Sequence, residues 1–291
     1  LIPATNGFQR WLPRQQQAVG RLLRRVIDDT KRYDRERTAT LLTFCRLPST
    51  GLASLRDDLQ NAQIPIQEAA LQGTTYLDQP GQALAELLNY LDSDRARVAM
   101  YAIPRAARYT PPALLAEKLG ELLARERLKV TVHKEALRLL GVHRVSGASQ
   151  TLLSQWQRPE LHRDVRIAVL HAARAILDET CWEILALAAN GQAEVARALL
   201  DQSPALLPQS ARERYAELVI QVAGSHEPRV REAAYQALSQ WATGLEEPVA
   251  RALSAAVLNL EIGAEWRLAA AGLVQVAGDG LALGVLSETA R

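Results

Sequence analysis

Apolar residues recur along this chain with the spacing of amphipathic helices. The clearest run begins at Val230 and continues at the third, fourth, seventh, eighth and eleventh positions after it, ending at Trp241. In a helix of 3.6 residues per turn, that spacing places the apolar side chains on one face, and the polar residues between them fill the other. A similar run starts at Val165 and reaches Ile176. Both segments are therefore predicted to be helices with one buried face.

The first residues of this helical pattern recur seven times along the chain. Each copy has an aliphatic residue followed four positions later by a residue that is usually small, and successive copies lie 30 to 38 residues apart; they begin at Ile66, Val98, Val132, Val165, Val195, Val230 and Leu268. A period of this length is typical of helical repeat arrays.

A second helix is predicted ahead of the repeated one in several copies, over residues 80–91, 111–126, 208–223 and 245–260. Three of these begin at proline, which the first helical turn tolerates because that position has no intrahelical N–H bond to lose. One helical hairpin cannot bury its apolar face alone, so consecutive hairpins must stack. We therefore predict an all-α fold, an α-solenoid of about seven stacked helical hairpins wound into a curved superhelix.

The repeat resembles the HEAT family, in which the second helix of each hairpin opens with Asp or Pro shortly before a Val-Arg pair and a small residue. Residues 227–234, Glu-Pro-Arg-Val-Arg-Glu-Ala-Ala, match best, and residues 162–168 and 93–99 also match. The resemblance covers roughly residues 36–280. It implies that the motif's Asp and Arg brace neighbouring repeats, which here are Asp94, Arg97, Asp164, Arg166 and Arg231.

Three regions are predicted: a basic helical cap over residues 1–35, the HEAT-like array over 36–280, and residues 281–291 as a C-terminal cap or the start of a further repeat. Gly278 and Gly280 are expected to end the last helix of the array. Within the cap, five arginines step by 4, 7, 4 and 7 residues. One continuous helix would place them on a single face.

Charge is distributed unevenly along the chain. Residues 1–150 carry 22 Lys and Arg against 15 Asp and Glu, a net charge of +7, whereas residues 151–291 carry 12 against 17, a net charge of −5. HEAT-like arrays bind partners on the concave surface lined by the second helices, so basic residues there could extend the arginine row of the cap. The predicted partner-binding residues are Arg10, Arg14, Arg21, Arg25, Arg32, Arg105, Arg108, Lys134 and Arg138. The competing interpretation is a solvated surface neutralised by nearby Asp and Glu.

Other residue types add little chemistry. Cys45 and Cys181 are far apart, outside any metal-ligand spacing, and are expected to be buried, inert thiols in a cytoplasmic protein. The five histidines form no metal motif, and neither a phosphate-binding loop nor a nucleophile motif is present. We therefore expect no cofactor, no metal and no small-molecule substrate. The lack of an 18-residue apolar run also argues against a membrane partner.

Trp241 and Trp266 are expected to pack between helices. The same is expected of Trp11, Trp156 and Trp182, unless one of these three is an exposed binding anchor.

The leading hypothesis is a non-catalytic scaffold whose concave face binds a protein. The absence of an initiator Met is compatible with a segment of a longer protein, and the Arg-rich composition, with four Lys among 34 basic residues, is typical of high-GC bacterial genes. The alternative is a nucleic-acid-binding protein or an enzyme similar to the alkylpurine DNA glycosylases built from HEAT-like repeats. The bilin lyases built on such repeats are a more distant alternative.

Overall fold

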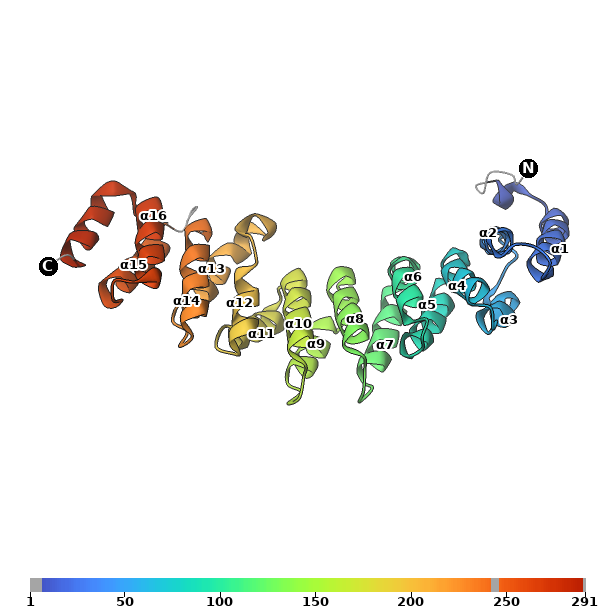
Figure 1. The fold of residues 1–291 in the computed structure, drawn as a ribbon, viewed down its shortest axis with the longest axis horizontal. Coiled ribbons are helices and arrows are strands. Elements are labelled where there is room, and N and C mark those ends of the chain that lie inside the picture. Colours follow the sequence, from blue (N-terminus) through green and yellow to red (C-terminus); the bar gives the residue numbers. More distant parts are fainter. Residues whose placement is uncertain (1–6, 242–245, 290–291) are drawn as a thin grey trace. The chain divides into compact units, whose positions relative to one another are not determined.

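The computed structural model describes residues 7–241 and 246–289, which are helical or lie in turns and contain no strand. The all-α prediction is therefore confirmed. The chain divides into two compact units, unit 1 (Leu1–Ala148) and unit 2 (Ser149–Arg291). Figure 1 shows their helices in chain order from α1 to α16.

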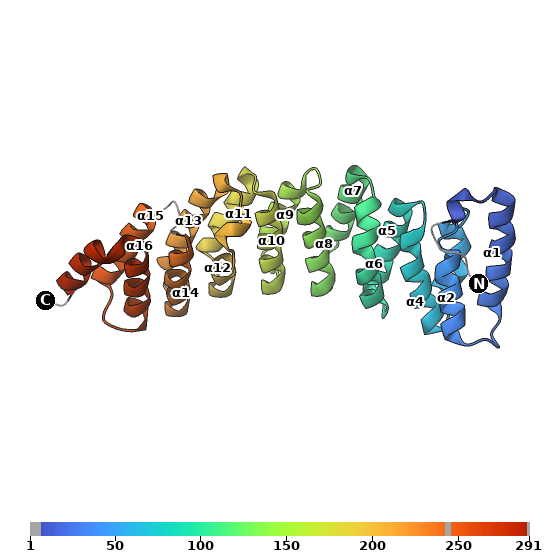
Figure 2. The ribbon, with the colours of Figure 1, turned by 90° about the horizontal axis from the view of Figure 1, so that it is seen from above.

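Unit 1 consists of paired helices arranged in two rows. The pairs are α1 (Pro13–Asp28) with α2 (Asp34–Phe44), α3 (Arg56–Leu59) with α4 (Ile64–Gly73), α5 (Pro80–Asn89) with α6 (Ala96–Tyr109), and α7 (Pro112–Leu123) with α8 (Val130–His143). Short 3-10 turns precede α3 and follow α4 and α5: η2 (Leu52–Leu55), η3 (Thr74–Tyr76) and η4 (Tyr90–Asp92). The second helices α2, α4, α6 and α8 pack in sequence as one row, and α5 and α7 pack together in the other (Figures 1 and 2).

Unit 2 repeats this plan. Its helices are α9 (Ala148–Trp156), α10 (Arg163–Ile176), α11 (Glu179–Ala189), α12 (Ala193–Leu200), α13 (Gln209–Ala223), α14 (Pro228–Leu238), α15 (Glu246–Asn259) and α16 (Ala264–Thr289). The second helices α10, α12, α14 and α16 form one row and α11, α13 and α15 the other. Aromatic rings link two successive pairs, because Tyr215 on α13 meets Trp182 on α11 edge-on at 6.4 Å between ring centres and stacks at 5.0 Å on Trp241, which directly follows α14.

The sequence repeat locates the second helices of both units. Each of the seven predicted copies lies near the start of a second helix, from Ile66 in α4 to Leu268 in α16, and in the first six the aliphatic residue is the third of its helix. Most of these residues are buried, and Ile66, Val132 and Val230 are fully so. The predicted packing role of Trp156, Trp182 and Trp241 is also confirmed, since each is buried.

Two predictions about helix ends are wrong. The five arginines of the cap do not share one helix: Arg10 ends the 3-10 turn η1 (Phe8–Arg10), and Arg32 lies in the turn between α1 and α2. Pro13 starts α1 and the extended backbone of Asp29 ends it, so only Arg14, Arg21 and Arg25 of the five share that helix. At the other end, α16 continues through residues 278–280. A glycine in a helix costs only about 1 kcal/mol, and the surrounding Ala and Leu residues favour helix.

The bracing role implied by the HEAT resemblance holds for some residues. Arg231 donates to both carboxylate oxygens of Glu265 on α16, at 2.7 and 2.8 Å, and so joins neighbouring pairs. Arg166 instead donates to the carbonyls of Trp156 and Arg158 within its own pair, and Asp164 accepts from the adjacent Arg163. Arg97 is exposed, and neither it nor Asp94 has a side-chain partner among the described residues. The brace is therefore confirmed for Arg231 but not for Asp94 and Arg97.

Candidate functional site

An open groove of about 600 Å³ lies between α1 and the end of α2. We call it the basic groove; its lining residues are Gln17, Gly20, Arg21, Arg24, Arg25, Phe44, Ser49 and Thr50. Gln17, Arg21 and Arg24 are three to four residues apart, so one face of α1 presents them together. Three arginines and two hydroxyl-bearing residues therefore border one hollow.

Arg24 is fixed by its neighbours. Its Nη1 donates to Oδ1 and Oδ2 of Asp58 at 3.1 and 2.9 Å, and its Nη2 donates to the same carboxylate. Its guanidinium carbon also lies 5.0 Å from the centre of the Phe44 ring. The Asp58 side chain is only 5% exposed, so this ion pair is a largely buried link between α1 and α3.

Arg21 and Arg25, which we call the groove arginines, are not held by neighbouring side chains as Arg24 is. Both side chains are exposed, and no ion pair or hydrogen bond engages either of them within the part of the chain that the structure describes. Asp58 does not neutralise them, because its carboxylate is occupied by Arg24. The groove therefore presents two guanidinium groups that can take an anionic ligand.

Burial raises the pKa of Asp58 from 3.8 to about 6, even though the nearby Arg24 cation lowers it. The carboxyl group is therefore mainly ionised at neutral pH, where it holds Arg24 in place. Below pH 6 it takes up a proton, and its charge-assisted bond to Arg24 weakens.

A second group of cations is formed by Arg46, just after the end of α2, and Arg105 on α6. The guanidinium carbons of Arg46 and Arg105 each lie 4.5 Å from the centre of the Tyr76 ring, and Arg46 donates to the Tyr76 hydroxyl at 3.2 Å. We call these three residues the arginine–tyrosine cluster. A Cβ on Gly73 would collide with the sulfur of Cys45, so glycine allows the ends of α4 and α2 to approach closely. That approach places Tyr76 beside Arg46.

The exposed face of α6 continues this chemistry. Arg97, Tyr101, Arg105 and Arg108 follow at intervals of four, four and three residues and are all exposed, with Tyr101 at 74%. Arg108 also lies over the ring of Tyr109, at 5.9 Å. This face therefore alternates cations with accessible tyrosine rings.

The structure sorts the predicted partner-binding residues into groups. Arg21 and Arg25 line the basic groove, Arg105 belongs to the arginine–tyrosine cluster, and Arg108 lies one turn further along α6. The exposed residues Arg10, Arg14 and Lys134 are not among those lining the groove or forming the cluster.

Two of the predicted residues are neutralised by carboxylates close in sequence. Arg32 pairs with Asp29 at 3.3 Å and with Glu36 at 3.5 Å, and Arg138 makes two hydrogen bonds of 2.8 Å to Glu135. The competing interpretation, a surface whose charges are offset by nearby acids, therefore holds at these two positions.

Sequence reasoning missed Arg46 and Tyr76. A signal was available, because Arg46, Tyr76 and Arg105 are separated by 30 and 29 residues, about one repeat length. Positions about one repeat apart lie close together in a stacked array, so this spacing points to a shared surface.

The thiols and histidines offer little chemistry. Cys45 and Cys181 are fully buried, and burial raises the pKa of Cys45 to about 12 and that of Cys181 to about 11, so both stay protonated and unreactive. Across residues 7–241 and 246–289, no group of His, Cys, Asp and Glu is arranged to hold a metal ion. None of the described helices combines the length and apolar content needed to cross a bilayer.

No family model matches the chain, and no curated protein matches it. Two crystal structures of engineered proteins from the Northeast Structural Genomics Consortium are similar to it. One has 17% sequence identity and a TM-score of 0.42 over 96% of this chain and 85% of its own. The other has 14% identity and a TM-score of 0.21 over 89% of this chain and 96% of its own. Similarity at this level carries no information about function.

Proposed function

We propose that this protein is a HEAT-like α-solenoid acting as a non-catalytic binding scaffold, and that unit 1 holds an acidic segment of a partner protein. The observation that supports this most is the convergence of arginines without carboxylate partners. Arg21 and Arg25 border one groove, and Arg46 and Arg105 share one tyrosine ring. A cytoplasmic location belongs to the proposal, supported by two cysteines that form no disulfide.

The arginine–tyrosine cluster attracts an anion for an electrostatic reason. Two like charges held against one ring repel each other, and within the described residues the Arg46 side chain donates only to the neutral Tyr76 hydroxyl. A carboxylate bound between them would relieve this repulsion and could accept parallel N–H bonds from a guanidinium fork. In the basic groove, Ser49 and Gln17 would add neutral donors beside the groove arginines, whereas the Thr50 hydroxyl already donates to the Phe44 carbonyl.

The exposed tyrosines favour a protein as the partner. Tyr101 and Tyr109 are 74% and 59% exposed, and tyrosine and arginine are the residue types enriched at the energetic centres of protein interfaces. An acidic peptide segment could lay apolar side chains on these rings while its carboxylates meet Arg105 and Arg108.

A nucleic acid is the second candidate, favoured by the alternation of Arg and Tyr on α6. Arginines could contact phosphates, and the tyrosine rings could stack on bases. Two observations rank it second. Arginines already cover the Tyr76 ring, and unit 2 carries a net charge of −5 that would repel a long polyanion.

The test is fluorescence anisotropy with a labelled peptide of alternating Glu and Leu, compared with single- and double-stranded DNA and RNA over a salt series. The expected result is tightest binding of the peptide, weakening as salt rises. The double variant Arg21→Glu with Arg25→Glu should lower peptide affinity at least about tenfold. Tighter binding of DNA or RNA would instead support the second candidate. If none of these probes binds at low salt, both are wrong.

A further inference from the structure

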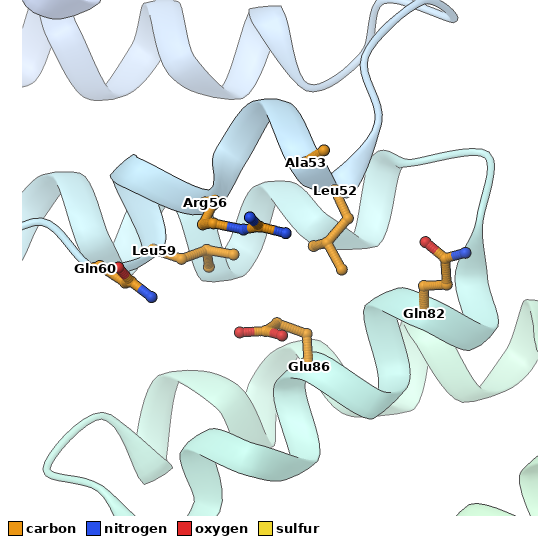
Figure 3. A pocket seen from close by; sticks show the side chains of 7 residues that line it. All are labelled: Leu52, Ala53, Arg56, Leu59, Gln60, Gln82 and Glu86. Carbon is orange, nitrogen blue, oxygen red and sulfur yellow. The ribbon is translucent and has the colours of Figure 1, made fainter.

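We propose that a small cavity between α3 and α5, which is partly open to solvent, binds a free α-amino acid in its zwitterionic form. The cavity has a volume of about 270 Å³, and its walls include Leu52, Arg56, Leu59, Gln60, Gln82 and Glu86 (Figure 3). It lies wholly within unit 1 and shares no lining residue with the basic groove, and the proposal does not depend on the proposed scaffold function.

Opposite charges enter the cavity from its two walls. Arg56 points into it from α3 and Glu86 from α5 (Figure 3). No ion pair joins them, and neither side chain has another partner among the residues that the structure describes. A ligand with a carboxylate and an ammonium group could satisfy both at once, with the carboxylate on the Arg56 guanidinium and the ammonium on the Glu86 carboxylate.

The remaining walls suit the rest of such a ligand. Leu52 and Leu59 supply apolar surface, and the amides of Gln60 and Gln82 lie toward opposite ends of the cavity, where each can donate or accept (Figure 3). Pockets for drug-sized ligands usually occupy about 300–1,000 Å³. A cavity just below that range fits a molecule the size of an amino acid.

The polar groups share the cavity because of their spacing. Arg56 and Gln60 are four residues apart, as are Gln82 and Glu86, and residues four apart in a helix project from the same face. When the two helices pack in neighbouring repeats, each contributes one charge and one amide to the space between them.

The walls are held in place before any ligand arrives. The Tyr90 hydroxyl, at the end of α5, donates to the Leu59 carbonyl at 2.8 Å, and the Gln67 amide on α4 donates to the same oxygen at 2.8 Å. The ion pair of Asp58 with Arg24 ties α3 to α1. The backbone that carries the walls is therefore held in place, so binding has to order only the side chains that contact the ligand.

The first step of the test is saturation-transfer difference NMR on the full chain with each of the twenty common L-amino acids at equal concentration. At least one should give a signal, and its affinity is then measured by calorimetry. The methyl ester of that amino acid, which lacks the carboxylate charge, and its N-acetyl derivative, which lacks the ammonium, should each bind at least about tenfold more weakly. If none of the twenty binds, the proposal is wrong.

The second step uses matched variants. Arg56→Gln and Glu86→Gln should each weaken binding at least about tenfold, whereas Arg127→Gln and Glu183→Gln, which remove the same charges at exposed positions elsewhere, should leave it unchanged. Circular dichroism should confirm that all four variants keep wild-type helicity. Binding that survives both cavity substitutions would place the ligand elsewhere and overturn the proposal. So would a loss of binding that is equal in the control variants.

Discussion

Unit 1 and unit 2 are both built from paired helices in two rows, but unit 1 carries 22 Lys and Arg against 15 Asp and Glu, and unit 2 carries 12 against 17. The arginines of unit 2 include several that link helices. Arg231 donates to the carbonyls of Ser225 and His226 as well as to Glu265, and Arg174, 8% exposed, donates to the carbonyl of Ala198 on α12. In unit 1, by contrast, the groove arginines and the Arg46–Arg105 pair face solvent or a tyrosine ring.

This comparison shows that residue type alone does not assign a role to arginine. Arg214 of unit 2 lies over an aromatic ring, as Arg105 of unit 1 does, but it also makes two hydrogen bonds to Glu179 at 2.8 and 2.9 Å. The nearby acceptor decides whether the guanidinium group is occupied by the protein or available to a ligand. The comparison predicts that removing arginines should affect stability in some places and binding in others.

The largest loss of stability is expected for Arg24, which differs from the groove arginines of unit 1 because it pairs with a buried carboxylate. Replacing Arg24 with Ala leaves the buried Asp58 carboxylate without its partner and should lower the free energy of unfolding by about 3 kcal/mol. The adjacent Arg25→Ala should cost less than about 0.5 kcal/mol, because its side chain is exposed. Urea denaturation followed by circular dichroism measures both. Equal losses in the two variants would contradict the distinction between Arg24 and the groove arginines.

A smaller loss is expected for the brace in unit 2. Arg231→Ala removes two bonds to Glu265 and two to backbone carbonyls, and should destabilise the fold by about 2 kcal/mol. Arg229→Ala, at an exposed position on the same helix, is the matched control and should have little effect. Hydrogen exchange read by mass spectrometry should show faster exchange in α14 and α16. Unchanged exchange there would mean that the brace contributes nothing to stability.

The two units should respond to pH in opposite directions. Because burial raises the pKa of Asp58 to about 6, native unit 1 binds a proton between about pH 4 and pH 6 that the unfolded chain does not. Protonation weakens the bond to Arg24 but removes the larger cost of burying the carboxylate charge, so this group adds about 3 kcal/mol of stability as pH falls through that window. In unit 2, burial would raise the pKa of Asp178, but hydrogen bonds from Ser149 and from the Cys181 N–H outweigh it and lower that pKa. Its contribution is complete above the ordinary Asp pKa and is lost as pH falls through the lowered value.

Urea midpoints at pH 2, 3, 4, 5, 6 and 7 for the wild type, Asp58→Asn and Asp178→Asn test this contrast. Asp58→Asn should abolish the rise in stability that the wild type shows as pH falls from 6 to 4. Asp178→Asn should abolish the fall in stability that the wild type shows below about pH 4. The same pH profile in both variants would show that neither carboxyl group has the environment described.

The smallest effect on stability is expected for the charge reversal of the groove arginines. Arg21→Glu with Arg25→Glu removes no ion pair or hydrogen bond recorded in the described residues, so the free energy of unfolding should change by less than about 0.5 kcal/mol. Thermal denaturation would check this, and a large loss would mean that these arginines have a structural role.

The helices were largely predictable from sequence because burial of one face imposes a period that is visible in the residues themselves. Ile66, Val132 and Val230 are buried third residues of their helices, as the repeat predicted. Helix ends were less predictable. The helix that carries the cap arginines begins at Pro13 and ends before Asp29, although the helical spacing of the arginines extends beyond both residues. Conversely, Gly278 and Gly280 do not end α16.

The candidate site was predicted only in part. Whether an arginine forms an ion pair depends on which residues lie next to it in the folded protein, and the sequence does not give all of these neighbours. Glu135 neutralises Arg138 from three residues away, which local spacing could have indicated. Asp58 occupies Arg24 from 34 residues away, which only packing reveals. Tyr76 brings together Arg46 and Arg105, which come from different helix pairs.

The most direct test of the central claim compares two double charge reversals in one binding assay. Arg21→Glu with Arg25→Glu alters unit 1, and Arg197→Glu with Arg229→Glu makes the same change in net charge at exposed positions on the second helices of unit 2. Anisotropy with the labelled Glu–Leu peptide should show at least a roughly tenfold loss of affinity, with a weaker salt dependence, for the unit 1 variant only. Equal losses in both variants would mean that the peptide responds to net charge alone, and would contradict a binding surface in unit 1.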